Sequence, residues 1–247
     1  MMRVKHFLKF SILLSAAFVL APRSANAISS VPNIFLGKNS NNENCFPLSL
    51  AFALSARNGN LFPILNSLAP NFPPLTSEGI LDTVYRICEV NGTEGFDSKR
   101  QKDCVQKIFR GWRVPVRLEV VNVPGTSEST VKRDVSIGDL QGNFPFHPGV
   151  LLNLGRYDLA ERPWKRKSGH TIALHHLESY NSVDDSSVAL VFDPANASGL
   201  SQIAIKHFKR IDEPVRATLY IAYSDYKKDE KNLMMIDSIL LFGSGHP

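Results

Sequence analysis

The chain has few cysteines, no internal repeat and no long apolar run beyond its N-terminal segment. Only three cysteines occur among 247 residues, which excludes the dense cross-linking of small disulfide scaffolds. After residue 27, no stretch is long and apolar enough to cross a bilayer. These absences exclude a repeat array and a protein with several membrane spans, and they predict one sizeable domain in residues 28–247.

The first 27 residues contain no acidic side chain. Their basic residues flank a short apolar stretch, Phe10–Ala21, which is well below the roughly 20 residues of a membrane-spanning helix. Ala25-Asn26-Ala27 fits the small-x-small pattern of a signal-peptidase site. We therefore predict a signal peptide over residues 1–27, cleaved after Ala27, a secreted or periplasmic location, and no stable membrane anchor after cleavage. An uncleaved anchor is the alternative.

Most of the excess positive charge lies in this segment. The whole chain has 28 Lys and Arg against 23 Asp and Glu, a formal net charge of +5. Four of the basic residues and none of the acidic ones precede residue 28, so the remainder carries a net charge of +1. A balance so close to neutral gives no case for a nucleic-acid partner.

The odd number of cysteines leaves one thiol over when the other two bond in an oxidising compartment. Cys88 and Cys104 are 16 positions apart, in helix-like segments separated by the turn-rich residues 91–95. We predict that they form a disulfide, which contributes about 3 kcal/mol in the chain-entropy model. Cys45 is then the free thiol. The alternative for Cys45 is a small buried apolar residue.

Helical patterns come first along the chain and strand patterns follow. We expect helices at Cys45–Ala56, from Ser77 to about Cys88, and at Ser98–Arg110. Six strands are expected at residues 116–120, 149–154, 170–177, 187–192, 217–223 and 235–242. This order predicts the α+β class with an antiparallel sheet. The small side chains of the first helix predict a position near the centre of the fold.

Cys45 lies at the start of the first expected helix, where unpaired amides and the helix dipole favour a thiolate. Gly169 and His170 open one expected strand, and Asp193 with Pro194 closes the next. A histidine and a carboxylate on neighbouring strands can supply a base and the group that orients it. Gly169 leaves room beside the histidine for a substrate or for the nucleophile helix. An aspartate before proline is also a common start of a turn.

This order of helical Cys45, Gly169-His170 and Asp193-Pro194 resembles the papain-like cysteine peptidase superfamily. It is most similar to the bacterial peptidases that process double-glycine leader peptides and to their exported relatives. Residues 148–153 also resemble the family's strand before the histidine. The resemblance covers about residues 33–195 and depends on about a dozen of them. It implies a papain-like fold, with the nucleophile helix packed on the sheet, and a Cys45–His170–Asp193 triad that needs no cofactor.

The implied activity is thiol hydrolysis of a peptide or related amide bond in a peptide or protein substrate. The Cys45 thiolate attacks the carbonyl carbon and forms a thioester, and His170 protonates the leaving amine. Asp193 fixes the tautomer of the imidazole. Asn39, six residues before the nucleophile, would help to stabilise the oxyanion. The family has Gln at the position of Asn39 and Gly at the position of Phe46.

Two other functions fit the same residues. A transglutaminase-like acyl transferase uses the same residue order and the same thioester, which then partitions to an amine instead of water. A catalytically inactive papain-like extracellular binding module is the second alternative, and Asn39 and Phe46 are the departures that favour it.

The basic run Arg162–Lys167, which includes Trp164, precedes the histidine. Such a run is commonly a solvated loop. The sharper hypothesis is a basic, aromatic rim beside the cleft, with Trp164 contacting an acidic or extended peptide. His175 and His176 are expected on the surface or packed on the sheet. Zinc held by these two with Cys45 has no recognised ligand spacing, so no metal site is predicted.

Overall fold

The computed structural model describes residues 35, 44–56, 76–90, 95–122, 137, 149–158, 165–183, 186–196, 199–209, 217–223 and 232–244. Three helices come first: α1 (Cys45–Ala56), α3 (Ser77–Ile87) and α4 (Ser98–Gly111). The strands follow as β1 (Val116–Asn122), β2 (Gly149–Asp158), β3 (Lys165–Asn181), β4 (Ser186–Phe192), β5 (Leu200–Lys209), β6 (Ala217–Tyr223) and β7 (Asn232–Ser244). The expected signal segment, Asn39 and Trp164 lie outside the described residues.

Helix α1 is the buried centre of the helical layer, as its small side chains predict. Every side chain from Phe46 to Ser55 is buried. The helix packs against β3 and β2 on one side and against α3 on another. Its first intrahelical bond runs from the Leu48 amide to the Asn44 carbonyl, 3.1 Å apart. Small side chains let the other elements approach this closely, so the nucleophile helix is held from several directions.

Helices α3 and α4 begin where the sequence predicts, because each is preceded by a capping side chain. The Thr76 hydroxyl accepts from the Gly79 amide at 3.1 Å, and the Asp97 carboxylate accepts from the Arg100 amide at 2.7 Å. Cys88 at the end of α3 and Cys104 within α4 lie at disulfide distance, with Cα atoms 5.0 Å apart. The two outer helices are therefore joined at that point.

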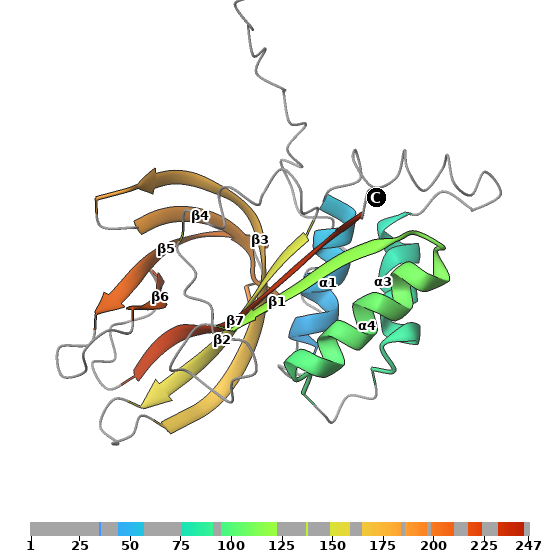
Figure 1. Ribbon diagram of the computed structural model, residues 1–247, viewed down its shortest axis with the longest axis horizontal. Coiled ribbons are helices and arrows are strands. Elements are labelled where there is room, and N and C mark those ends of the chain that lie inside the picture. Colours follow the sequence, from blue (N-terminus) through green and yellow to red (C-terminus); the bar gives the residue numbers. More distant parts are fainter. Residues whose placement is uncertain are drawn as a thin grey trace, which may run out of the picture.

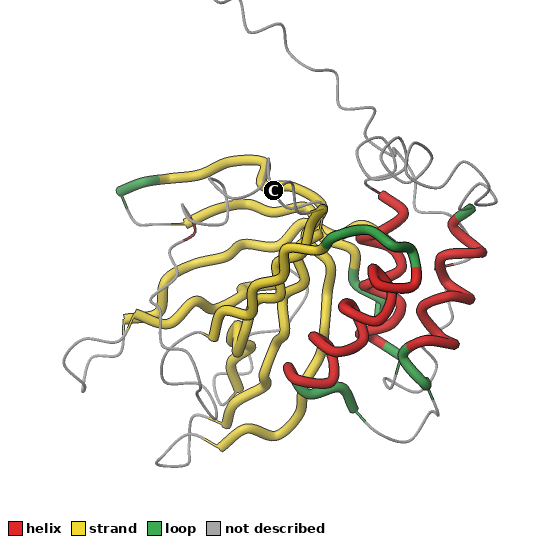
Figure 2. The backbone as a smooth tube through the Cα atoms, turned by 45° about the vertical axis from the view of Figure 1, so that its right-hand side comes forward, coloured by secondary structure: helices red, strands yellow, loops and turns green. Residues whose placement is uncertain are grey.

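The seven strands form one antiparallel sheet in the order β1-β7-β2-β3-β4-β5-β6. Strand β6 also pairs with the N-terminal half of β7, through Tyr220 and Ile221. Six strands therefore curl back on themselves, while β1 pairs with the C-terminal half of β7. Figures 1 and 2 show the helices gathered on one side of this curled sheet. The α+β class with an antiparallel sheet is confirmed.

Two apolar clusters lie on opposite faces of the sheet. The first joins the three helices to sheet residues Leu151, Ala173, Phe192, Leu240 and Phe242. The second fills the inside of the curl with side chains that alternate with the first set along β2, β3 and β4, among them Leu152, Ile172 and Val191. Because both faces of these strands are buried, their relative positions are strongly specified.

Two features of the sheet differ from the sequence-based expectation. Strand β5 was not predicted, so the expected number of six strands is wrong. The register of β3 against β4 shifts between Leu174 and His176, and again between Leu177 and Ser179. Leu177 consequently packs with the cluster inside the curl, not on the face of Ala173 as strict alternation predicts.

Candidate active site

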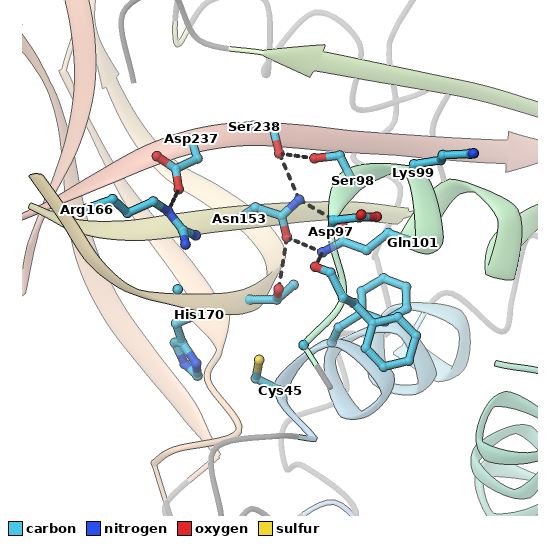
Figure 3. Close-up of a pocket in the computed structure, with 15 residues that line it drawn as sticks. Cys45, Asp97, Ser98, Lys99, Gln101, Asn153, Arg166, His170, Asp237 and Ser238 are labelled. Carbon is cyan, nitrogen blue, oxygen red and sulfur yellow. Dashed lines mark hydrogen bonds and ion pairs between the residues drawn. The ribbon is translucent and has the colours of Figure 1, made fainter. Parts of the chain in front are cut away.

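The first residue of α1 and the first half of β3 meet at one cavity. Cys45 and His170 both line this cavity (Figure 3), and the imidazole lies near enough to the thiol to lower its pKa. The Ser49 hydroxyl, one turn into α1, donates to the Thr171 carbonyl at 2.9 Å and ties the helix to the strand. Residues 125 positions apart in the chain are thus held in contact by the packing of α1 on β3.

Asp193 lies behind the imidazole, as predicted. Its Oδ1 is 2.6 Å from the His170 Nε2, and the carboxylate is 7% exposed. The same Oδ1 accepts from the Ala195 amide at 2.8 Å, and the Asp193 carbonyl accepts from the Asn196 amide at 2.9 Å. The turn that follows β4 therefore positions the carboxylate. Turn formation and histidine orientation, posed as alternatives by the sequence, occur together.

The electrostatics favour a charged Cys45–His170 pair. Burial acts to raise the pKa of the Cys45 thiol, but hydrogen bonding and charge from His170, with added hydrogen bonds from Thr171, hold that pKa below its ordinary value of 9.0. Burial acts to lower the pKa of His170, yet Asp193 and Cys45 together raise it to about 9. A lowered thiol pKa beside a raised imidazole pKa favours the thiolate–imidazolium form of the pair.

Thr171 is a contributor that the sequence analysis missed. Its backbone and its hydroxyl lie near Cys45 and lower the pKa of the thiol. The hydroxyl also donates to the Asn153 side chain at 2.9 Å. The only available signal was its place directly after His170, since the residue next to a strand histidine points to the opposite face, where the helix lies.

A cavity of about 800 Å³ opens between the helical layer and the sheet. Its lining comes from the start of α1, the residues that lead into α4, and strands β2, β3 and β7. Cys45, Gly169 and His170 all face it, together with Thr171. This volume lies in the range of pockets that bind small molecules or a short peptide segment.

Phe46 forms part of one apolar wall of this cavity. It is 1% exposed, and its ring lies 4.7 Å from that of Phe96, centroid to centroid. The Arg100 guanidinium covers the Phe96 ring at 4.3 Å. Because Cys45 and His170 line the same cavity, the large side chain at position 46 does not place them at separate surfaces.

A buried network of polar side chains connects α4, β2 and β7 at the wall of the cavity. Asn153 and Gln101 exchange two amide hydrogen bonds of 2.8 and 2.9 Å, and the Asn153 amide also donates to the Ser238 hydroxyl at 2.9 Å. Ser238 lies 3.3 Å from the Ser98 hydroxyl of α4. These contacts join α4 to β2 and β7 (Figure 3), so two sides of the cavity are linked by buried hydrogen bonds.

A second charged group lies at another part of the same cavity. The Arg166 Nε donates to the Asp237 Oδ2 at 2.7 Å, and the Tyr157 hydroxyl donates to the Asp237 Oδ1 at 2.5 Å. Asp237 is 5% exposed, and burial raises the pKa of its carboxyl although Tyr157 and Arg166 oppose the shift. In the sequence, Arg166 is one of several basic residues in the run Arg162–Lys167, and no motif marks Asp237 or Tyr157.

The other candidate residues from the sequence have different placements. His175 and His176 form a 2.7 Å contact between their Nδ1 atoms, and His175 packs near Phe52 of α1. Both are half-buried on the sheet. Among the described residues, no group of three or more His, Cys, Asp or Glu side chains could hold a metal ion.

A scan of the chain against protein-family models finds no match, and a search among curated proteins finds none either. Within the described part of the chain, no helix has the length and hydropathy required to span a membrane. The site geometry is therefore the basis for any statement about function.

Proposed function

We propose that this protein is an exported thiol hydrolase with a papain-like fold, which cleaves a peptide or related amide bond through a Cys45–His170–Asp193 triad. The observation that carries the proposal is the placement of the Cys45 thiol and the His170 imidazole at one cavity, with the imidazole hydrogen-bonded to the buried Asp193 carboxylate. A nucleophile and a base that face one cavity, with an orienting carboxylate behind the base, are the requirements of covalent acyl transfer.

Each side chain has one task in this reaction. Because the His170 Nε2 faces Asp193, its Nδ1 is the ring nitrogen left for Cys45. The Cys45 thiolate adds to the substrate carbonyl, and the C–N bond breaks as His170 gives its proton to the leaving amine. Neutral His170 then removes a proton from water, which attacks the thioester and regenerates the thiol. Asp193 holds the ring and stabilises the imidazolium.

The oxyanion requires hydrogen-bond donors near the sulfur. The Cys45 amide is among the first amides of α1, which have no intrahelical partner. It is therefore a candidate donor, and the side-chain amide of Asn39 remains the second one proposed from the sequence. A single such donor contributes about 3 kcal/mol to transition-state stabilisation.

The proposal is tested by digesting a synthetic peptide mixture with residues 28–247 and reading the products by mass spectrometry. We expect new peptide termini that are absent with Cys45→Ala, and a transient thioester mass on the protein. Adding hydroxylamine distinguishes hydrolysis from acyl transfer, because a transferase accumulates hydroxamate and few free acids. Absence of both products, together with slow thiol alkylation at neutral pH, would favour the inactive binding module.

The proposed export is tested separately. Expression of the full chain should yield an extracytoplasmic product whose N-terminus begins at Ile28 when read by mass spectrometry. Retention of residues 1–27 on a membrane-bound product would instead support the uncleaved anchor.

A further inference from the structure

We propose that Arg166 binds a carboxylate of the substrate beside the scissile amide, and so selects acidic substrates at this cavity. This inference rests on the proposed function, because it takes Cys45 as the reacting group. Arg166 lies four residues before His170 on the same strand and faces the same cavity.

The guanidinium is anchored on one side only. Its Nε donates to Asp237 at 2.7 Å. Within the part of the chain that the structure describes, neither Nη1 nor Nη2 has a hydrogen-bond partner. The Arg166 side chain is 45% exposed, whereas the Asp237 side chain is 7% exposed. A fixed guanidinium with both terminal amino groups available has the fork geometry that matches a carboxylate.

The backbone is shaped to make room for this group. Gly155 of β2 pairs with Gly169 of β3. A Cβ on Gly155 would lie 2.5 Å from the Asp237 Oδ2, and a Cβ on Gly169 would collide with the Arg166 Nη2. The guanidinium thus lies over Gly169, one residue away from His170.

Irregular pairing also directs the two charged side chains. The register of β2 against β7 passes from Asn153–Ser238 to Leu154–Ile236, so Asp237 is the additional residue of a bulge. The register of β2 against β3 passes from Arg156–Ser168 to Tyr157–Arg166, so Lys167 is the additional residue of a second bulge, next to Arg166. Bulges redirect side chains, and these two bring Asp237 and Arg166 to the cavity.

The balance of charge leaves Arg166 able to attract an anion. Both oxygens of Asp237 are engaged within the protein, one by Tyr157 and one by Arg166. Asp97 and Lys99, on the opposite side of the cavity, are exposed and of opposite sign. The remaining charge at this part of the cavity is the exposed Arg166 guanidinium, which an anion can reach from solvent.

The position of Arg166 specifies which carboxylate it can bind. A group over Gly169 is one residue from the base, so the anion belongs to a residue directly next to the scissile bond. Two sources supply that chemistry: the side chain of an Asp or Glu residue, and the free C-terminal carboxylate of a short peptide.

The test compares two alkylating reagents of similar size at Cys45. Iodoacetate carries a carboxylate and iodoacetamide is its neutral counterpart, so the ratio of their rates measures anion binding near the thiol. We expect Arg166→Gln to lower the iodoacetate-to-iodoacetamide ratio about fivefold, the loss of one moderately exposed charged hydrogen bond. Lys167→Gln is the matched control, since it removes a neighbouring positive charge that does not line the cavity. Its ratio should stay within about twofold of the unmodified protein.

A folding defect is addressed by a second variant. Arg166→Gln leaves buried Asp237 without its cation, which destabilises the fold. The double variant Arg166→Gln with Asp237→Asn removes both charges and keeps similar shapes, and it should show the same lowered ratio. Unchanged ratios in a folded double variant would overturn the proposal.

The same alkylation experiment tests the anion site separately from the proposed function. The iodoacetate-to-iodoacetamide ratio is measured at pH 10 as well as at pH 7, because thiols ionise at pH 10 even without activation and guanidinium groups keep their charge there. Slow alkylation at pH 7 contradicts the triad, whereas an Arg166-independent ratio at both pH values contradicts only the anion site.

Peptides then identify the source of the carboxylate by protecting Cys45 from iodoacetamide. An end-blocked peptide with one Glu, its Gln counterpart, and the Gln peptide with a free C-terminus are compared. Stronger protection by the Glu peptide identifies the side chain, and stronger protection by the free C-terminus identifies the chain end. Both preferences must disappear in Arg166→Gln. Equal protection by all three peptides would contradict the proposal.

Discussion

Two pairs of a basic side chain and a buried carboxylate lie at the same cavity, four residues apart along β3. His170 pairs with Asp193 across to β4, and Arg166 pairs with Asp237 across to β7. The distances are similar, 2.6 and 2.7 Å, and both carboxylates are less than a tenth exposed. The pairs nevertheless have different chemical capacities, because one base can release its proton and the other cannot.

The environment of each pair matches that difference. His170 contacts the Cys45 thiol, and its pKa of about 9 lets it hold and then transfer a proton. A guanidinium does not act as an acid or base in proteins, so the second pair can only bind and orient. The buried Asp237 keeps the guanidinium in place as Asp193 keeps the imidazole in place. One strand thus carries a group for bond cleavage and, as we propose, a group for substrate selection.

The largest expected effect comes from removing the titrating base. His170→Ala should slow alkylation of Cys45 by iodoacetamide at pH 7 by about 100-fold, because the thiol loses the group that lowers its pKa. Reactivity should return at pH 10, where the bare thiol ionises. The measurement is a rate–pH profile by intact mass. A neutral-pH rate equal to that of the unmodified protein would show that the two halves of the pair are not coupled.

A tenfold effect is expected when only the carboxylate behind the base is neutralised. Asp193→Asn retains the turn, since an amide oxygen can still accept from the Ala195 amide. The pKa of His170 should fall from about 9 toward 6.5, which reduces the ion pair at neutral pH. We expect the alkylation rate at pH 7 to drop about tenfold, which corresponds to a loss of about one pKa unit of coupling between the His170 imidazole and the Cys45 thiol. At pH 10 the rate should match that of the unmodified protein. NMR titration of the imidazole checks the shift directly.

A smaller effect, on the reagent ratio, is expected when the Arg166 guanidinium is displaced without being removed. Gly169→Ala places a methyl group where the Arg166 guanidinium lies, and the long side chain must move aside. The iodoacetate-to-iodoacetamide ratio should fall about two- to threefold, less than for loss of the whole group. Gly95→Ala, which adds a methyl group in open space at the same cavity, is the matched control. Equal ratios in both variants would show that the position of the guanidinium has no influence.

The smallest expected effect is on the pH dependence of stability. The pKa of His170 is raised in the folded protein, so its contribution is present below pH 6.5 and is lost as the pH rises toward about 9. Cys45 has a lowered pKa and titrates in the opposite sense, so the measurement uses Cys45→Ala. In that variant, Asp193 still raises the pKa of His170, and the free energy of unfolding in urea should decline from pH 6 to pH 9. Adding Asp193→Asn should flatten the decline. A flat profile in Cys45→Ala alone contradicts the buried pair.

The thiol and the first pair were predictable because they have recognisable local contexts. In the sequence, Cys45 begins a helical pattern, His170 begins a strand pattern and Asp193 ends the next one, although β3 itself begins at Lys165. The second pair was not predictable, because Arg166 sat in a charged run and Asp237 in an apolar strand. A bulge turns Asp237 toward the cavity, and no periodic pattern reveals where a bulge will occur. The missed strand β5 had only short alternation, around Ile203 and Ile205.

Local patterns in the sequence were sufficient to predict the helices and most of the strands. Apolar spacing and capping side chains define the starts of α3 and α4, and alternation defines most strands. They were also sufficient to nominate the thiol, the imidazole and the carboxylate. The folded arrangement alone decided that the sheet curls until β6 meets β7, that Thr171 supports the thiol, and that Arg166 lies over Gly169. The reason is physical, because these contacts depend on register shifts and packing between segments distant in sequence, and such pairings have no local energetic signature.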